Sequence, residues 1–273
     1  MPHKTKKLFS FCGKHPFIAT FVYIAIVSAI FLAVPRLDIW ATQLFYAGDG
    51  VFPASVSPFF KKLRYLGPHL MTWIAAISVI LLLLKLLIPS KKSIVDLRAP
   101  LFLITTLIMG PGIVVNAILK NNWGRPRPKH IEEFGGVDPF IGIWNPTDIC
   151  PTNCSFVSGE ASMAIWLFAV VFLLPRFWKW PAAIFIAILC LVFSANRVAF
   201  GGHFLSDTLL SWGITMLVIL TTYFLLYRWT PKWAQPEALD SSFSKAGFWL
   251  HKKGAIVGTR IAEAFKGFIA KFR

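Results

Sequence analysis

Six long apolar runs divide this chain, and they constrain its fold more than any other feature. Each run holds about 17 to 20 residues, enough for an α-helix to cross a hydrocarbon core roughly 30 Å thick. In lipid, every backbone polar group has to be satisfied inside the segment, so helices are the expected form. The runs cover residues 17–34, 70–88, 101–119, 158–174, 181–200 and 208–227. The sequence therefore predicts an all-α polytopic membrane protein built as a six-transmembrane-helix bundle.

The composition supports a membrane location over a nucleic-acid-binding role. Hydrophobic residues make up 56% of the chain and charged residues 15%. A net charge of +16 would suggest nucleic acid as the partner of a soluble protein, but membrane topology already accounts for these cations. Four lysines precede the first run, as in a secretory signal. The run is long and lacks a small-residue cleavage site, so we interpret it as a retained helix.

The distribution of Lys and Arg predicts the orientation in the membrane. Nineteen of the 28 fall on the N-terminus, the connections after the second and fourth runs, the tail, and Lys85 at a helix end. By the positive-inside rule this side is cytoplasmic, together with both termini. The periplasmic side then receives the loops 35–69, 120–157 and 201–207. We divide the chain into a basic cytoplasmic leader (1–16), a membrane domain (17–229) and a basic cytoplasmic tail (230–273).

The tail is predicted to be an amphipathic helix on the anionic cytoplasmic leaflet. Its apolar residues recur at helical spacing, and basic residues lie between them: Ile261, Phe265, Phe268, Ile269 and Phe272, with Arg260, Lys266, Lys271 and Arg273. A partner-binding tail is the alternative interpretation.

The first outer loop, 35–69, mixes aromatic residues with Lys61, Lys62 and Arg64. Such a segment is expected to lie along the membrane surface. We prefer packing over the mouth of the bundle as its role. The alternative is a platform that admits an anionic lipid from the side.

Two polar motifs carry the candidate chemistry. Residues 120–128 read Lys-Asn-Asn-Trp-Gly-Arg-Pro-Arg-Pro, and arginine forks bind phosphate oxygens bidentately. These cations stand on the side that the positive-inside rule disfavours, which argues against a simple charged turn. The second motif runs from Arg197 to Asp207. If a helix opens at Gly202 or His203, His203 and Asp207 share a face. The carboxylate can then hold the imidazole as a nucleophile or base.

Together with Ser158-Gly159, these motifs resemble the three-part signature of the type 2 phosphatidic acid phosphatase (PAP2) superfamily. In order, the matching residues are Lys120, Arg127-Pro128, Ser158-Gly159, Arg197, His203 and Asp207. The resemblance implies phosphate binding by Lys120, Arg127, Arg197, the Ser158 hydroxyl and the Gly159 amide. It implies that His203 forms a phosphohistidine and that Asp207 orients His203. Fixed cations and a helix N-terminus suffice to stabilise a transferring phosphoryl group, so no metal or other cofactor is expected.

The middle motif departs from the family at Glu160, where a histidine commonly donates a proton to the leaving group. One interpretation is that Glu160 has a raised pKa and is the proton donor. The other is that Glu160 is ionised and paired with a cation, which leaves His130 or water as the acid.

The loop before Ser158 contains Cys150 and Cys154, and two states of this pair remain open. In an oxidising compartment they form a small disulfide that fixes the approach to Ser158. Alternatively they stay reduced, because a bridge at this spacing inside a helix is strained.

The resemblance implies an integral membrane lipid phosphatase, and we place its site on the periplasmic face of a bacterial inner membrane. The implied substrates are lipid A phosphates, undecaprenyl pyrophosphate, phosphatidylglycerol phosphate and phosphatidate. Glu160 and the aromatic outer loop resemble the bacterial lipid A phosphatase branch. A lipid-to-lipid phosphotransferase is one alternative, and a catalytically silent lipid-binding or transport protein is another. The intact Arg197, His203 and Asp207 argue against the silent protein. A soluble haloperoxidase shares the signature but not the apolar runs.

Overall fold

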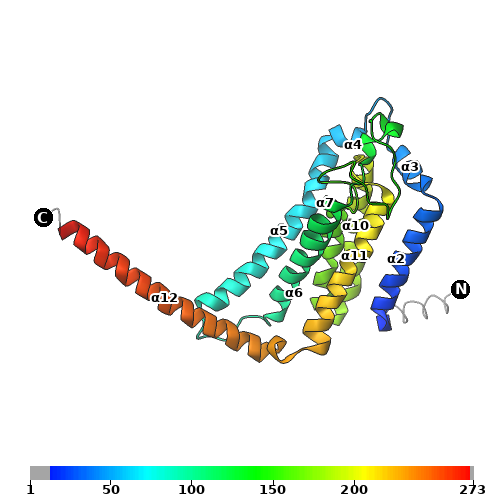
Figure 1. Ribbon diagram of the computed structural model, residues 1–273. Coiled ribbons are helices and arrows are strands. Elements are labelled where there is room, and N and C mark those ends of the chain that lie inside the picture. The colour runs from blue at the N-terminus through cyan, green and yellow to red at the C-terminus, as the bar shows by residue number, and fades with distance from the viewer. Residues whose placement is uncertain (1–12, 271–273) are drawn as a thin grey trace.

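The computed structural model describes residues 13–270, and every regular element in that part of the chain is a helix (Figure 1). In chain order the elements are α2 (Pro16–Ala33), α3 (Arg36–Gln43), α4 (Pro53–Val56), α5 (Pro58–Leu87), α6 (Arg98–Leu107), the π-helix η1 (Ile108–Leu119), α7 (Lys120–Asn122), the short 3₁₀ turns η2 (Pro128–His130) and η3 (Glu132–Phe134), α8 (Gly159–Trp166), α9 (Phe168–Leu173), α10 (Arg176–Ala199), α11 (Leu205–Tyr223), η4 (Phe224–Trp229), η5 (Lys232–Ala234) and α12 (Pro236–Ala270). The predicted all-α class is confirmed.

Within the described residues, five helical segments are long and apolar enough to cross a membrane. They are Pro16–Ala33, Pro58–Leu87, Arg98–Asn122, Arg176–Ala199 and Leu205–Trp229, and each overlaps one predicted run. The fourth predicted run is different: Gly159–Leu173 is shorter than 18 residues, and a break at Leu167 separates α8 from α9. The six-span count is therefore not confirmed.

The short α8 lies inside the bundle. Six of its eight residues are buried. Its polar groups find partners on neighbouring helices: the Ser162 hydroxyl lies 2.6 Å from the Thr215 hydroxyl of α11, and the Trp166 indole donates to Thr106 of α6 at 3.0 Å. Because α8 is enclosed by other helices, its position does not depend on spanning the bilayer by itself.

The third span changes its helical form near its middle. Pro111 lies inside η1, where the chain follows a π-helix, and the Asn116 side-chain amide donates to the Pro111 carbonyl at 2.6 Å. The Asn116 side chain thus satisfies a backbone carbonyl where the helical hydrogen-bond register changes. A Cβ on Gly110 would lie 3.3 Å from Thr215 of α11. Helix α11 therefore approaches η1 closely at this glycine.

The first outer loop is shorter than predicted. Helix α5 begins at Pro58 rather than near His69, because proline is favoured in the first turn, where its missing N–H would have no partner. The remainder of the loop contains α3 and α4. Lys61 and Arg64 are consequently fixed on the first turns of a long helix.

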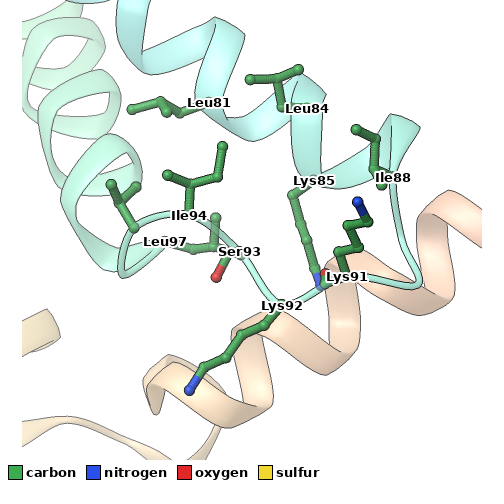
Figure 2. A pocket seen from close by; sticks show the side chains of 10 residues that line it. Leu81, Leu84, Lys85, Ile88, Lys91, Lys92, Ser93, Ile94 and Leu97 are labelled. Atoms are coloured by element: carbon green, nitrogen blue, oxygen red, sulfur yellow. The ribbon is translucent and has the colours of Figure 1, made fainter.

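The connections that carry the polar motifs share one end of the bundle, and α12 lies across the other end (Figure 1). The Lys85 ammonium on α5 contacts Asp240 of α12 at 2.9 Å and the Lys91 carbonyl at 2.7 Å. The other Asp240 oxygen accepts from the Ser93 amide at 3.0 Å. Figure 2 shows Lys85 reaching from α5 toward this connection and α12. This anchoring fixes the start of the tail helix. Most of the predicted leader lies outside the described residues, as do Lys271, Phe272 and Arg273.

Candidate active site

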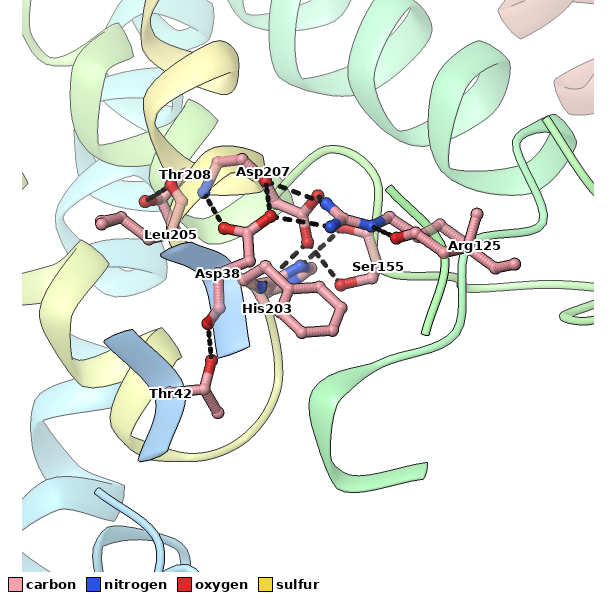
Figure 3. Close-up of polar contacts among 11 residues, drawn as sticks. Asp38, Thr42, Arg125, Ser155, His203, Leu205, Asp207 and Thr208 are labelled. Atoms are coloured by element: carbon pink, nitrogen blue, oxygen red, sulfur yellow. Dashed lines mark hydrogen bonds and ion pairs between the residues drawn. The ribbon is translucent and has the colours of Figure 1, made fainter. Parts of the chain in front are cut away.

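His203 occupies a tight turn between α10 and α11 and not a helix, so the expectation that a helix opens at Gly202 or His203 is wrong. Gly201 has φ +60°, which glycine adopts without strain, and α11 begins only at Leu205. The imidazole is fully buried, and its Nδ1 lies 2.7 Å from the Ser155 backbone carbonyl (Figure 3). A carbonyl only accepts hydrogen bonds, so Nδ1 carries the proton and Nε2 keeps its lone pair.

Electrostatics also keep His203 neutral. Burial lowers its pKa to about 4; Glu160 opposes this shift, and Arg197 and Lys120 add to it. A neutral imidazole with a free Nε2 is the reactive form of a histidine nucleophile.

We predicted that the Asp207 carboxylate holds the imidazole of His203, but the carboxylate binds other groups instead. As the third residue of α11, it reaches back to the start of its own helix, where one carboxylate oxygen accepts from the Phe204 amide at 3.0 Å. The same oxygen accepts from the Ser155 hydroxyl at 2.5 Å. Asp207 therefore holds Ser155, and the carbonyl of Ser155 holds His203. Its influence on the imidazole is indirect.

A buried ion cluster supports Asp207, and no sequence motif predicted this cluster. Arg125 is fully buried and donates to Asp207 at 2.5 Å and to Asp38 of α3 at 2.8 Å (Figure 3). Asp38 also accepts from the Ser206 amide at 2.9 Å. Arg125 thus anchors the loop and is turned away from any phosphate. One signal was available: Asp38 is the first acidic residue of the chain and stands among apolar residues.

The other predicted cations gather beside His203. Arg197, on the last turn of α10, is 3% exposed. Arg127 donates to the Asn153 backbone carbonyl at 2.7 Å, which fixes its guanidinium. Arg127 and Arg197 both line a cavity of about 280 Å³. Lys120 lies close enough to His203 to lower its pKa. The structure therefore brings together the three cations expected to bind phosphate.

Ser158 and Gly159 form the N-terminus of α8. The Ser158 hydroxyl accepts from the Ala161 amide at 3.3 Å and is fully buried, so it acts as the helix N-cap. The Gly159 amide is in the first turn of the helix, so it has no hydrogen-bond acceptor within the helix. A Cβ on Gly159 would meet the Asn116 side-chain oxygen at 2.8 Å. Only glycine lets α8 start so close to η1.

Glu160 lies between the cations and the imidazole. One carboxylate oxygen is 3.2 Å from Arg197 and 3.5 Å from Arg64, and the other is 3.3 Å from His203 Nε2. Two guanidinium groups favour the ionised carboxylate, as in the second interpretation above. Arg64, from α5, was not among the predicted site residues. His130, the alternative acid, is an exposed residue outside the residues that line the cavity.

Cys150 and Cys154 are joined by a disulfide, with their Cα atoms 5.7 Å apart. The segment is not helical, so the helix geometry that argued for reduced thiols does not apply. The Cys154 amide donates to the Lys120 carbonyl at 3.1 Å, and the Ser155 amide donates to the Arg125 carbonyl at 2.8 Å. The bridge thus closes the loop directly before the residue that positions His203.

The assembled site suits phosphoryl transfer. A neutral imidazole with a free Nε2 stands beside three cations and a helix N-terminus, which together attract and orient a phosphate. Among residues 13–270, no group of three His, Cys, Asp or Glu side chains is arranged to hold a metal ion.

The chain is similar to several known proteins. The PAP2 superfamily profile matches residues 99–233. The chain is 33% identical over 204 residues to a lipid A 4'-phosphatase of Rhizobium leguminosarum, covering 70% of this chain and 87% of that protein. It is 35% identical over 200 residues to a lipid A 4'-phosphatase of Francisella tularensis subsp. novicida, covering 72% and 90%. A crystal structure of a transmembrane PAP2-type phosphatidylglycerolphosphate phosphatase from Bacillus subtilis shares 18% identity and gives a TM-score of 0.47, over 76% of this chain and 94% of that chain.

Proposed function

Because the chain belongs to the PAP2 superfamily, we propose that it hydrolyses a lipid A phosphate through a phosphohistidine on His203. Its relatives and its apolar helices make it a multi-pass membrane lipid phosphatase. The similarity to lipid A 4'-phosphatases favours the 4'-phosphate of lipid A over the other lipid phosphates considered. The tautomer of His203 carries the proposal, since the hydrogen bond from Nδ1 to Ser155 leaves Nε2 unprotonated and able to attack once Glu160 is displaced.

The reaction proceeds in two displacements. His203 Nε2 attacks the phosphorus, an N–P bond forms, and the P–O bond to the lipid breaks. Lys120, Arg127 and Arg197 balance the charge on the three equatorial oxygens, together with the Gly159 amide. Water then attacks the phosphohistidine and gives a proton to the Glu160 carboxylate, the N–P bond breaks, inorganic phosphate leaves, and the imidazole is neutral again. Asp207 acts from behind through Ser155 and keeps the imidazole oriented.

Glu160 serves the leaving group in this scheme. Its carboxylate contacts Arg197 and His203 Nε2 directly, so an incoming phosphate has to displace it from both. The negative charge of the phosphate then competes for the same cations, which favours protonation of Glu160. A protonated Glu160 can give its proton to the lipid oxygen as the P–O bond breaks.

The positive-inside rule supports a periplasmic site and cytoplasmic termini in a bacterial inner membrane. The polar end of the bundle carries only cations that belong to motifs or line the cavity, with the exceptions of Arg36 and Lys62. A lipid whose phosphate lies at the membrane surface reaches the site without leaving its leaflet.

The test is phosphate release by purified protein from a panel of lipid A, polyprenyl pyrophosphate, phosphatidylglycerol phosphate and phosphatidate. We expect the highest kcat/KM for lipid A, and phosphate trapped on His203 in acid-labile form. Replacing His203 with Ala should abolish trapping and turnover. Replacing Glu160 with Gln should lower turnover about 10²-fold or more and change its pH profile. An active His203→Ala variant would refute the nucleophile.

A further inference from the structure

The cavity beside the site holds more positive charge than one phosphate needs. Its lining residues include Arg127 and Arg197 of the proposed phosphate clamp and three further cations, Lys61, Arg64 and Lys129. These three come from α5 and η2 and lie outside the family signature. None of the residues lining the cavity is acidic.

The balance of charge separates two groups of cations. Lys120, Arg127 and Arg197 carry three positive charges. These suffice for the dianion of a phosphate monoester, whether Glu160 is ionised or protonated. The other group, Lys61, Arg64 and Lys129, is then left without a counter-charge from the scissile phosphate. Within the described residues, the only carboxylate within 4.0 Å of these three is Glu160, beside Arg64.

Burial and the neighbouring cations lower the pKa of Lys129. Partial burial lowers its pKa, and Arg127, Arg197 and Arg64 lower it further. The Lys129 amide donates to the Gly201 carbonyl at 3.1 Å, so its backbone is tied to the turn that carries His203. An anion bound between these cations would relieve their mutual repulsion.

We propose that Lys61, Arg64 and Lys129 form a second anion subsite, which binds another phosphate or carboxylate group of the same lipid molecule. This proposal rests on the proposed function and deepens it. The preferred substrate class is a lipid with two anionic groups close enough to enter this one cavity, one of which is the scissile phosphate. Binding energy from the second group positions the first against His203. The subsite thereby selects among lipid phosphates by their charge.

Two small inhibitors test the subsite without depending on a particular lipid. Methylenebisphosphonate presents two linked anionic groups, and methylphosphonate presents one. We expect the bisphosphonate to inhibit the wild-type protein at least tenfold more strongly. In a double variant, Lys61→Gln with Lys129→Gln, this ratio should fall at least fivefold. Both side chains are exposed, so the double variant is expected to fold. Arg64 is left unchanged because it also contacts Glu160.

Lys62→Gln is the matched control, because Lys62 is an exposed neighbour on α5 that does not line the cavity. It should keep the wild-type ratio. Equal inhibition of the wild type by both compounds would overturn the proposal, as would an unchanged ratio in the double variant. Adding inorganic phosphate to methylphosphonate distinguishes a linked group from a free ion. If that mixture inhibits as well as the bisphosphonate, the cations hold free phosphate and the proposal is wrong.

Calorimetric titration measures the binding affinities of the same two compounds directly, without an assay of lipid turnover. A protein that hydrolyses no lipid phosphate but binds the bisphosphonate selectively would refute the phosphatase reaction and keep the subsite. A phosphatase that does not distinguish the compounds would refute the subsite alone.

Discussion

A single residue, His203, sets the acidic limit of the reaction. Its pKa is lowered to about 4, chiefly by burial, so the imidazole is neutral and nucleophilic above that pH and is protonated below it. We expect kcat/KM to be sustained through pH 6.5, the usual pKa of histidine, and to fall only as the pH approaches about 4. The measurement is a pH profile of kcat/KM in detergent micelles. In a Glu160→Gln variant the acidic limb should move to lower pH, because Glu160 raises the pKa of His203. An acidic limb centred near 6.5 would contradict the assigned environment.

Asp38 supports the site from outside the reacting groups, through its contacts with Arg125 and Ser206. Removing it as Asp38→Ala leaves Arg125 buried with one carboxylate partner. Breaking a buried ion pair in this way costs about 3–5 kcal/mol. We expect a lower thermal midpoint in detergent and a lower kcat, because Asp207 and Ser155 lose their support, while KM changes little. Asp38→Asn keeps an oxygen for the Ser206 amide and should recover part of both. Wild-type stability and kcat in Asp38→Ala would show that the cluster does not position the site.

At the scale of the elements, the sequence predicted the parts that depend on local pattern. Apolar periodicity and length located five helices. The start of α5 was missed because Lys61 and Arg64 interrupt the apolar pattern although they continue the same helix. The fourth run forms α8 and α9 in place of one long helix. Its apolar pattern did not reveal this, because a helix enclosed by other helices is as apolar as one facing lipid.

The site shows the same division between local and long-range information. The resemblance to the PAP2 superfamily predicted the motif residues and their gathering. The partner of the imidazole was not: Ser155 acts through its backbone carbonyl, which no side-chain pattern reveals. Asp38 meets Arg125 across 87 positions of sequence, and only the packing of α3 against the loop brings them together.

The start of α8 gives a prediction at this scale. Gly159→Ala would place a Cβ 2.8 Å from the Asn116 side-chain oxygen. Because Asn116 is held by its hydrogen bond to the Pro111 carbonyl, we expect α8 to shift away from η1. We expect kcat to fall tenfold or more, because the Gly159 amide and Glu160 move relative to His203. Gly142→Ala is the control, since its Cβ would meet nothing within 4 Å. Measured kcat and thermal midpoint for both variants check the prediction, and an equally active Gly159→Ala would contradict it.

The whole molecule is organised as two chemically different ends. The polar motifs occupy one end, and α12 lies across the other (Figure 1). Leu239 is buried near the start of this helix, while Leu250, Val257, Ile261 and Phe265 are exposed farther along. These positions share one side of the helix at 3.6 residues per turn. We therefore propose that the exposed part of α12 lies on the anionic leaflet, as its basic residues also favour.

This arrangement predicts which residues each compartment can reach. Val137 lies in the polar-end loop and is 87% exposed, and Ile94 lies at the α12 end and is 81% exposed. In a Cys12→Ser background, a membrane-impermeant thiol reagent should label Val137→Cys in cells whose outer membrane is permeabilised. Ile94→Cys should be labelled only after the inner membrane is opened. The native Cys190 is buried and Cys150 is bridged to Cys154, so neither should contribute. The reverse labelling pattern would place the site in the cytoplasm, and a lipid phosphate in the periplasmic leaflet could then not be the substrate.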